Sequence, residues 1–412
     1  MCRNPGARRL IRRTMILSRL PFFALAAGAG LFLSACAGFG RPPVAAHYDL
    51  LIGGYTEGSA GAGRRRGVEV YRFDTATGGL TFLRENAGIR NPSWLLAHDA
   101  GRTVYTVNEL NGGGAGRVSA FRFDAVSGTL TFLNDAASGG DDPCHLAFDG
   151  PAASASRDVP ECVDRQAPHA VKLYVSNYSS GGMKALAVDV DGRFAGEGAA
   201  SASVSVPAGA RSHMHSTALA GGVVYVADLG TDRILRRRHR GPELVDAGEC
   251  RLPAGTGPRH LVFDRSGKNA YVVGELNDSV THLVSTDENL SIAATYPLGA
   301  PSAFKKGTAA AVRLSDDGRF LYASTRDPKN AVHVFAVDAV TGALTDVQTI
   351  ASGGRAPRDI VLSPDGRFLL AANQKSDGIA VFARDPQSGR LAGPLKTLRS
   401  GSPSALVWVA AP

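Results

Sequence analysis

The sequence predicts an all-β fold, a seven-bladed β-propeller, from three observations. First, a hairpin of two short apolar strands recurs, most clearly where residues 258–263 and 270–276 flank the turn Asp264-Arg265-Ser266-Gly267. A short Ser-Gly connection makes the two strands antiparallel. Second, both strands and a third unit after them have seven copies about 50 residues apart, as propeller blades require. Third, the chain starts and ends on half a hairpin.

The copies of the three units can be placed along the chain. First strands are expected at residues 91–96, 142–147, 212–216, 258–261, 307–312, 357–361 and 402–407. Second strands are expected at residues 49–55, 103–109, 172–178, 223–229, 269–275, 320–326 and 368–374. Third units follow at 71–80, 121–130, 334–344 and 381–391, with weaker copies near Ala185, Arg236 and His282. The second strands are apolar on both faces, so we expect them between neighbouring blades.

One blade is expected to be completed from both ends of the chain. The second strand at 49–55 has no first strand before it, and the first strand at 402–407 has no second strand after it. Pairing these two strands closes the ring and removes the exposed sheet edges at the seam. We therefore assign residues 48–412 to a single propeller domain, which we expect to be a monomer.

The N-terminal segment has the pattern of an export signal. In residues 1–35, arginines precede a short apolar run that ends in small residues, which is typical of a signal peptide and too short for a stable membrane span. Leu33-Ser34-Ala35-Cys36 resembles a bacterial lipobox, in which the cysteine is acylated. We expect an exported, periplasmic protein held to the bacterial outer membrane only by a lipid on Cys36, with residues 36–47 as a linker.

The basic charge of the chain comes mostly from that segment. Residues 1–35 hold six of the 45 lysines and arginines and none of the 37 acidic residues, which leaves 39 basic against 37 acidic residues. Nucleic-acid binding requires a persistent basic surface, so no nucleic-acid partner is expected.

Cysteine usage indicates no structural zinc site. Outside the N-terminal segment the chain has Cys144, Cys162 and Cys250, with no Cys-x-x-Cys spacing, so structural zinc is not expected. Export permits a disulfide. A Cys144–Cys162 bridge is the candidate, because it would pin the insertion that carries Cys162 to its blade.

Polar residues gather where first strands begin and second strands end, which is one mouth of the central channel. The first strands contribute His145, His213, His215, Arg259, His260 and Arg358. The second strands contribute Asn108, Glu109, Asn177, Tyr178, Asp228, Glu275, Arg326 and Asn373. Asp228 is expected to cap its own turn, and Asn177 and Asn373 to bond the backbone at strand ends. A functional role is favoured for the positions without such a local purpose, which are His213, His215, Arg259, Glu275 and Arg326.

Missing motifs narrow the chemistry. The chain has no G-x-S-x-G, P-loop, G-x-G-x-x-G or H-E-x-x-H motif, so serine hydrolysis and nucleotide chemistry lose support and no cofactor is expected. A metal held by His213, His215 and a third ligand such as Glu275 stays open as an alternative. A metal-free site suits proton transfer beside an anion, because histidine titrates near neutrality and arginine binds carboxylate or phosphate bidentately.

These motifs, in this order, resemble the seven-bladed lactonase family that includes propeller-type bacterial 6-phosphogluconolactonase and fungal carboxymuconate cyclase. The resemblance covers residues 48–410 and rests on Asn108-Glu109-Leu110, Pro143-Cys144-His145, Asn177-Tyr178-Ser179, His213-Met214-His215-Ser216, Asp228-Leu229-Gly230-Thr231-Asp232, Gly257-Pro258-Arg259-His260 and Glu275-Leu276. It implies a metal-independent site at the channel mouth in which a histidine, two arginines and a glutamate act. Two features depart from the family: Ser324-Thr325-Arg326 replaces the common Ser-Asn-Arg, and cytosolic members lack a lipobox.

The leading hypothesis is hydrolysis of a sugar-acid lactone or another carboxylated lactone. A histidine of the 213/215 pair would deprotonate water, and Arg259 and Arg326 would hold the substrate anion and stabilise the oxyanion. Glu275 would orient a histidine or protonate the leaving alkoxide. The expected substrate-binding positions are Glu109, His145, Asn177, His260 and Arg358. Two alternatives remain: a lactonising cyclase that uses the same residues in reverse, and a non-catalytic envelope propeller that binds a sugar acid or a partner.

Overall fold

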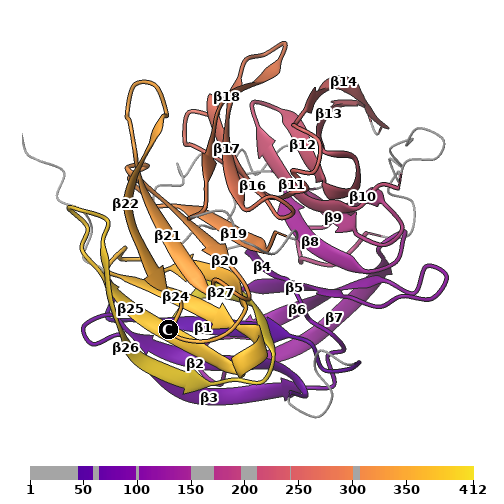
Figure 1. Ribbon diagram of the computed structural model, residues 1–412. Helices are drawn as coiled ribbons and strands as arrows, with labels where there is room; N and C mark the ends of the chain where they lie inside the picture. Colours follow the sequence, from indigo (N-terminus) through magenta and orange to yellow (C-terminus); the bar gives the residue numbers. More distant parts are fainter. Residues whose placement is uncertain are drawn as a thin grey trace, which may run out of the picture. The chain divides into compact units, whose positions relative to one another are not determined.

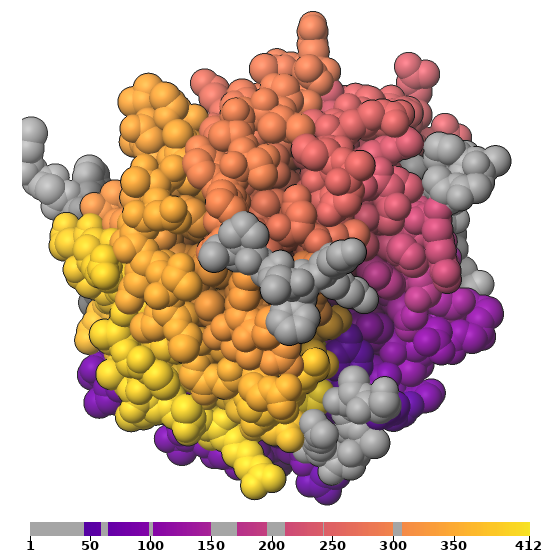
Figure 2. Space-filling view, viewed as in Figure 1, coloured from indigo at the N-terminus to yellow at the C-terminus, as the bar shows by residue number. Residues whose placement is uncertain are grey.

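The computed structural model confirms the predicted seven-bladed propeller. The structure describes residues 45–58, 65–98, 102–149, 171–195, 211–241, 243–299 and 307–412, which belong to one compact unit, Val44–Pro412. Seven antiparallel sheets are formed by these residues (Figure 1). On the face shown in Figure 2, the colours pass around the molecule from purple through magenta and orange to yellow.

The strands fall into four positions within a blade. The inner strands are β4 (Leu95–His98), β8 (Pro143–Phe148), β11 (Met214–Ala220), β15 (Pro258–Phe263), β19 (Ala309–Leu314), β23 (Pro357–Leu362) and β27 (Pro403–Ala410). The second strands are β1 (His47–Gly54), β5 (Thr103–Asn108), β9 (Val171–Asn177), β12 (Val223–Asp228), β16 (Asn269–Gly274), β20 (Phe320–Thr325) and β24 (Phe368–Asn373).

The third and outer strands complete the blades. The third strands are β2 (Gly67–Asp74), β6 (Arg117–Asp124), β10 (Gly182–Val188), β13 (Arg233–Arg240), β17 (Ser279–Ser285), β21 (Ala331–Val337) and β25 (Gly378–Arg384). The outer strands are β3 (Gly79–Ala87), β7 (Thr129–Ala137), β14 (Glu243–Arg251), β18 (Leu290–Pro297), β22 (Leu344–Ala351) and β26 (Leu391–Arg399). The β8–β9–β10 blade has no fourth strand among the described residues. The described ranges also contain two 3-10 turns, η1 (Leu229–Thr231) and η2 (Gln374–Ser376).

The inner strands form a closed circle. Each one contacts the inner strands of both neighbouring blades, in the order β27, β4, β8, β11, β15, β19, β23 and back to β27. The second strands lie between the blades, and β5, β12, β20 and β24 are buried along their whole length, as their apolar sequences predicted. Their tyrosines bridge to the next blade: the Tyr271 and Tyr322 hydroxyls donate to the carbonyls of Gly342 and Gly389.

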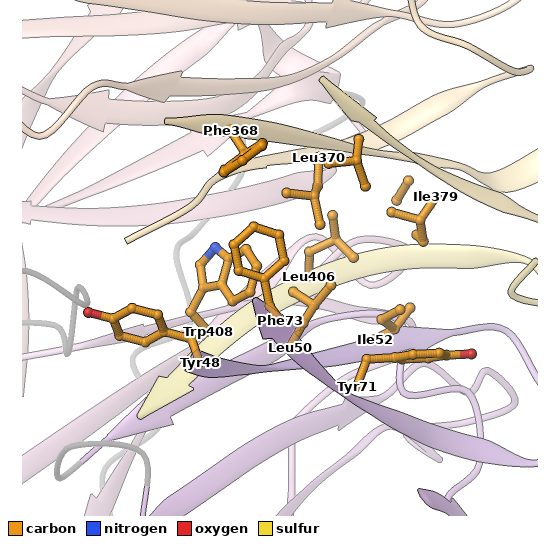
Figure 3. Close-up of a cluster of buried hydrophobic side chains, with 12 residues drawn as sticks. Tyr48, Leu50, Ile52, Tyr71, Phe73, Phe368, Leu370, Ile379, Leu406 and Trp408 are labelled. Atoms are coloured by element: carbon orange, nitrogen blue, oxygen red, sulfur yellow. The ribbon is translucent and has the colours of Figure 1, made fainter. Parts of the chain in front are cut away.

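The predicted closure through both ends of the chain is confirmed. β1 pairs antiparallel with β27 on one side and with β2 on the other. The side chains at this seam form the cluster drawn in Figure 3, where the Phe73 ring lies edge-on to Trp408, with ring centres 5.0 Å apart, and to Phe368 at 5.5 Å. Trp408 Nε1 also donates to the Leu362 carbonyl at 2.7 Å, which ties β27 to the preceding blade.

Some predictions concern residues outside the described ranges. These are the signal segment 1–35, the lipid-bearing Cys36, the linker up to residue 44 and Cys162, the suggested disulfide partner of Cys144. Cys144 and Cys250 are buried free thiols. In the part of the chain that the structure describes, no helix has the length and apolar character needed to cross a membrane.

Candidate active site

Near the start of several inner strands, the pairing with the second strand is irregular and leaves out one residue. In β8, β11 and β23, Cys144, His215 and Arg358 have no partner in the register, since their neighbours on both sides pair with adjacent residues of the second strand. In β15 the irregularity lies between Pro258 and Leu261 and contains Arg259. A bulge re-aims a side chain and is frequent beside active sites. We call Cys144, His215, Arg259 and Arg358 the bulge residues.

The residue that follows each second strand supplies the other half of the cluster. Tyr55, Glu109, Tyr178, Glu275 and Arg326 directly follow β1, β5, β9, β16 and β20, and we call them the rim residues. Because both strands of a hairpin are antiparallel, the start of one lies beside the end of the other. The bulge and rim residues therefore meet at one end of the circle of inner strands, which we call the channel mouth.

A tight turn brings Arg259 and Glu275 together. The Glu275 amide donates to the Gly257 carbonyl at 2.8 Å, beside the pairing of β15 and β16. Gly257 has a φ of +59°, and a Cβ at this position would lie 2.4 Å from Leu276 Cγ. Glycine is required here, because any side chain would meet both strain and a clash.

Glu275 lies between two arginines. Its Oε1 is 2.8 Å from Arg326 Nη2, and its Oε2 is 3.0 Å from Arg259 Nε in an ion pair that lacks hydrogen-bond alignment. Burial raises the pKa of Glu275, but Arg326 and Arg259 lower it more. The pKa of this carboxyl therefore lies below its usual value, and the group is ionised at neutral pH. Burial lowers the pKa of Arg259 to about 9, against the opposing effect of Glu275, and the guanidinium is charged at neutral pH.

Both arginines are fastened to the backbone yet keep free donors. Arg326 Nε donates to the Thr308 carbonyl at 3.0 Å, and Arg259 Nη1 contacts the Ala310 carbonyl and lies 3.0 Å from His260 Nε2. Arg259 Nη2 and Arg326 Nη1 have no acceptor among the described residues. These two amino groups, on side chains that the backbone holds in place, are the candidates for binding an oxyanion.

The structure gives the two histidines of the 213/215 pair different surroundings. The half-buried His213 ring stacks on Tyr178, with ring centres 4.5 Å apart, and its Nδ1 lies 2.9 Å from the Tyr178 carbonyl. A carbonyl only accepts, so Nδ1 carries the proton and Nε2 is the free acceptor. His215 is buried beside Cys144 and Tyr178, and its pKa lies well below the usual value because of burial and the nearby Arg259 and Arg358, so it is neutral.

A second group of rim and bulge residues contains the remaining arginine of the cluster. The Tyr55 hydroxyl donates to Glu109 Oε1 at 2.8 Å and accepts from Arg358 Nη2 at 2.9 Å. Ser93 Oγ contacts the other oxygen of Glu109. Arg358 and Arg259 influence each other electrostatically, and both act on Glu275, so the two groups share one site.

Of the other expected substrate-binding residues, Asn177 and His145 lie outside the bulge and rim residues, whereas His260 contacts Arg259 through its Nε2. Asn177 is the last residue of β9, is buried, and donates from Nδ2 to the Ser138 carbonyl, a strand-end cap of the kind expected. His145 and His260 are buried one residue beyond the bulge positions, where their rings contact Trp94 at 4.4 and 5.0 Å. The turn-capping role expected for Asp228 is confirmed, since its carboxylate accepts from the Gly230 amide and the Thr231 hydroxyl.

Comparison with known proteins agrees with this architecture. Residues 49–408 match the family described as Lactonase, 7-bladed beta-propeller. The chain belongs to this lactonase family. The solved structure of the periplasmic gluconolactonase PpgL from Pseudomonas aeruginosa is 34% identical, with a TM-score of 0.75, over 89% of this chain and 100% of that one.

Curated relatives of this lactonase-family chain carry related names. A 6-phosphogluconolactonase of Formosa agariphila is 31% identical over 240 residues, which are 53% of this chain and 65% of the relative. A 6-phosphogluconolactonase of Bacillus subtilis is 31% identical over 170 residues, 41% of this chain and 48% of the relative. The matched parts thus span about half to two thirds of these relatives.

The geometry of this lactonase-family site bears on the alternative of a bound metal and on the role of Cys144. Among the described residues, no three or more His, Cys, Asp or Glu side chains are arranged to hold a metal ion. Cys144 is not poised as a nucleophile, because burial raises the pKa of its thiol and its Sγ contacts the carbonyls of Ser176, Met214 and His215.

We expect the protein to lose stability in acid because it contains buried histidines. Burial, with Arg313 and Arg259 adding to it, lowers the pKa of His145 to about 3. The unfolded chain takes up a proton near pH 6.5, whereas the folded chain does not, so protonation favours unfolding as pH falls from about 6.5 to 3. In urea unfolding, His145→Gln should flatten this decline by about 1.4 kcal/mol per pH unit. The exposed His47→Gln should not, and equal slopes for both variants would refute the assignment.

Proposed function

We propose that the protein is a lactonase that hydrolyses the lactone of a sugar acid at the mouth of its central channel. The observation that carries this proposal is the Arg259–Glu275–Arg326 group in a chain of the lactonase family, together with His213, which stacks on Tyr178, a rim residue that Glu275 and Arg259 influence electrostatically. The names of the gluconolactonase and 6-phosphogluconolactonases that resemble the chain favour a sugar-acid lactone over other esters.

In this proposal the two arginines stabilise the charge that develops on the carbonyl oxygen. Attack of water on the lactone carbonyl makes a tetrahedral oxyanion, which Arg259 Nη2 and Arg326 Nη1 would bind. Ion pairs to Glu275 and bonds to backbone carbonyls hold both guanidinium groups in place before substrate arrives. Donors fixed in advance lower the barrier because they need no reorganisation during the reaction.

His213 is the proposed general base. Its Nε2 is the free acceptor and takes a proton from the attacking water as the C–O bond forms. When the oxyanion collapses, the ring C–O bond breaks and the imidazolium returns this proton to the leaving alkoxide. Water is thereby added across the ester bond, and the product is a hydroxy acid with no proton gained or lost by the protein.

The contacts of Glu275 favour a different role from the two expected for it. Its partners are arginines, not a histidine, so it does not orient the base. Its lowered pKa keeps it ionised, so it has no proton to give to an alkoxide at neutral pH. We assign it as the positioning residue for Arg259 and Arg326.

We further propose that this reaction takes place outside the cytoplasm. The support is the signal-like segment with Leu33-Ser34-Ala35-Cys36 and the likeness to a lactonase described as periplasmic. A lipid on Cys36 would keep the enzyme at the membrane, and Cys36→Ser should leave unprocessed or soluble protein without the lipid.

The direct test is acid release from glucono-δ-lactone by the purified full-length protein, followed by pH-stat titration at pH 6.5 against the spontaneous rate. The proposal expects clear acceleration that EDTA leaves unchanged. No acceleration with this lactone, its 6-phosphate or D-glucaro-1,4-lactone would overturn the proposed activity. Loss of activity with EDTA and recovery with zinc or calcium would overturn the metal-free mechanism.

His213→Gln should lower kcat by about 10²–10⁴-fold, because a positioned general base contributes that much to the rate. KM should change little, since the base acts on water and not on the bound lactone. The control is His239→Gln, which replaces a histidine that contacts Lys172 and Tyr174 rather than the channel-mouth residues. An unchanged kcat in His213→Gln would shift the role of base to another group.

A further inference from the structure

We propose that Arg358, held by Tyr55 and Glu109, forms a separate subsite that binds a single negative charge on the substrate itself, such as a carboxylate on the lactone. This inference rests on the proposed function and divides the arginines of the site by task. Arg259 and Arg326 would serve the reacting carbonyl, and Arg358 would select the substrate.

Arg358 differs from the other two arginines in its partners. It has no carboxylate within ion-pair distance among the described residues, whereas Arg259 and Arg326 share Glu275. Its Nη2 donates to the Tyr55 hydroxyl at 2.9 Å, and the guanidinium carbon lies 5.4 Å from the centre of the Tyr55 ring. Nε and Nη1 have no acceptor in the described part of the chain. Because Nη2 carries a second hydrogen, it forms an open two-donor edge with Nη1 or with Nε, and such an edge matches the geometry of a carboxylate.

Tyr55 and Glu109 fix the direction of this fork. Glu109 is occupied at both oxygens, by the Tyr55 hydroxyl and by Ser93 Oγ. The hydroxyl gives its only proton to Glu109, so it must accept from Arg358, and the guanidinium is held by one edge. Burial raises the pKa of Tyr55, which keeps the hydroxyl protonated and the chain of bonds intact.

The charge of the site sets the class of ligand. The cluster contains three arginines and two glutamates, and the pair formed by Arg358 and Glu109 is bridged by a neutral tyrosine. One positive charge therefore remains uncompensated among the described residues of the cluster. A monoanionic carboxylate balances it, whereas a phosphate ester with nearly two negative charges exceeds it. The expected substrate is a lactone with one carboxylate.

The test compares kcat/KM for D-glucaro-1,4-lactone, which bears one carboxylate, with neutral glucono-δ-lactone and its 6-phosphate. In the wild type the carboxylated lactone should be preferred over both. Arg358→Gln should lower the ratio of carboxylated to neutral lactone about 10–100-fold, mainly through KM, as expected for loss of a charged hydrogen bond. An unchanged ratio would overturn the subsite, and a preference for the phosphate would overturn its assignment to a single charge.

Two further variants separate recognition from folding. Tyr55→Phe keeps the ring and removes the bridging hydroxyl, so it should lower the same ratio less than Arg358→Gln does. Arg384→Gln is the matched control, since Arg384 also donates to a tyrosine hydroxyl, that of Tyr322, but on the third strand β25. It should reduce stability without changing the ratio. A similar change of ratio in the control would contradict the proposal.

Binding of the product class tests the subsite independently of catalysis. Titration calorimetry with glucarate should give a Kd that rises about 10–100-fold in Arg358→Gln. If this holds while no lactone is hydrolysed, the proposed function fails and the anion subsite stands. If glucarate does not bind, or binds both proteins equally, the subsite fails whatever the activity.

Discussion

Glu275→Gln is expected to lower kcat/KM by about 10²–10³-fold, although the glutamate itself never touches the reacting atoms. The carboxylate holds Arg259 and Arg326 in position through one oxygen each. A neutral amide can accept from only one of them, so the other guanidinium loses its fixed direction. Loss of one preorganised oxyanion contact raises the barrier by about 2.7–4 kcal/mol. The measurement is steady-state kinetics with glucono-δ-lactone at pH 6.5.

The same change should also reduce stability, because it removes the counter-charge of the buried Arg259. Circular dichroism and assays well below the melting temperature separate that effect from catalysis. The matched control is Glu249→Gln on β14, where the glutamate also bridges two arginines, Arg233 and Arg251, at 2.9 and 2.7 Å but outside the channel mouth. Its kcat/KM should stay at the wild-type value. If kcat/KM fell equally in both variants, Glu275 would have no specific role in the active site.

Deleting residues 402–412 should prevent stable folding, the largest stability effect expected for this chain. The deletion removes β27, exposes the edge of β1 and takes Trp408 out of the seam cluster (Figure 3). Trp408→Ala alone should cost about 3–5 kcal/mol, since a large buried side chain leaves a cavity. Thermal unfolding and gel filtration would report unfolded or aggregated protein.

Removal of residues 411–412 alone is the control for that deletion. These two residues follow the end of β27 and lie at the surface, so the melting temperature should stay within a degree or two of the wild type. A 402–412 deletion that melts like the control would show that the ring does not depend on the β1–β27 pairing.

The sequence was enough to predict the propeller because the hairpin repeats in a regular pattern. Both faces of a second strand are apolar, and antiparallel pairing then places Arg259 and Glu275 at one end. The unequal halves at residues 49–55 and 402–407 likewise predicted the closing blade. These features depend on local patterning and strand direction, which are visible in the amino-acid order.

The finer composition of the site could not be predicted, because it depends on register. Side chains alternate between faces, so a shift of one residue separates a buried cap from a channel residue. Asn177 caps its strand while the next residue, Tyr178, contacts His213 and His215. Tyr55 was not selected from the sequence, because its side-chain direction also depends on strand register. Its position directly after a second strand, like that of Glu109 and Glu275, was the available signal. The bulges at the inner strands have no sequence signal of their own.

The most direct test of the central claim is a crystal structure of the protein with gluconate, the product of glucono-δ-lactone hydrolysis. We expect the carboxylate within hydrogen-bond distance of Arg259 Nη2 and Arg326 Nη1, with His213 Nε2 facing its carbon. Gluconate bound elsewhere, for example in the groove between β3 and β7 that Arg84 and Phe132 line, would contradict a catalytic site at the channel mouth.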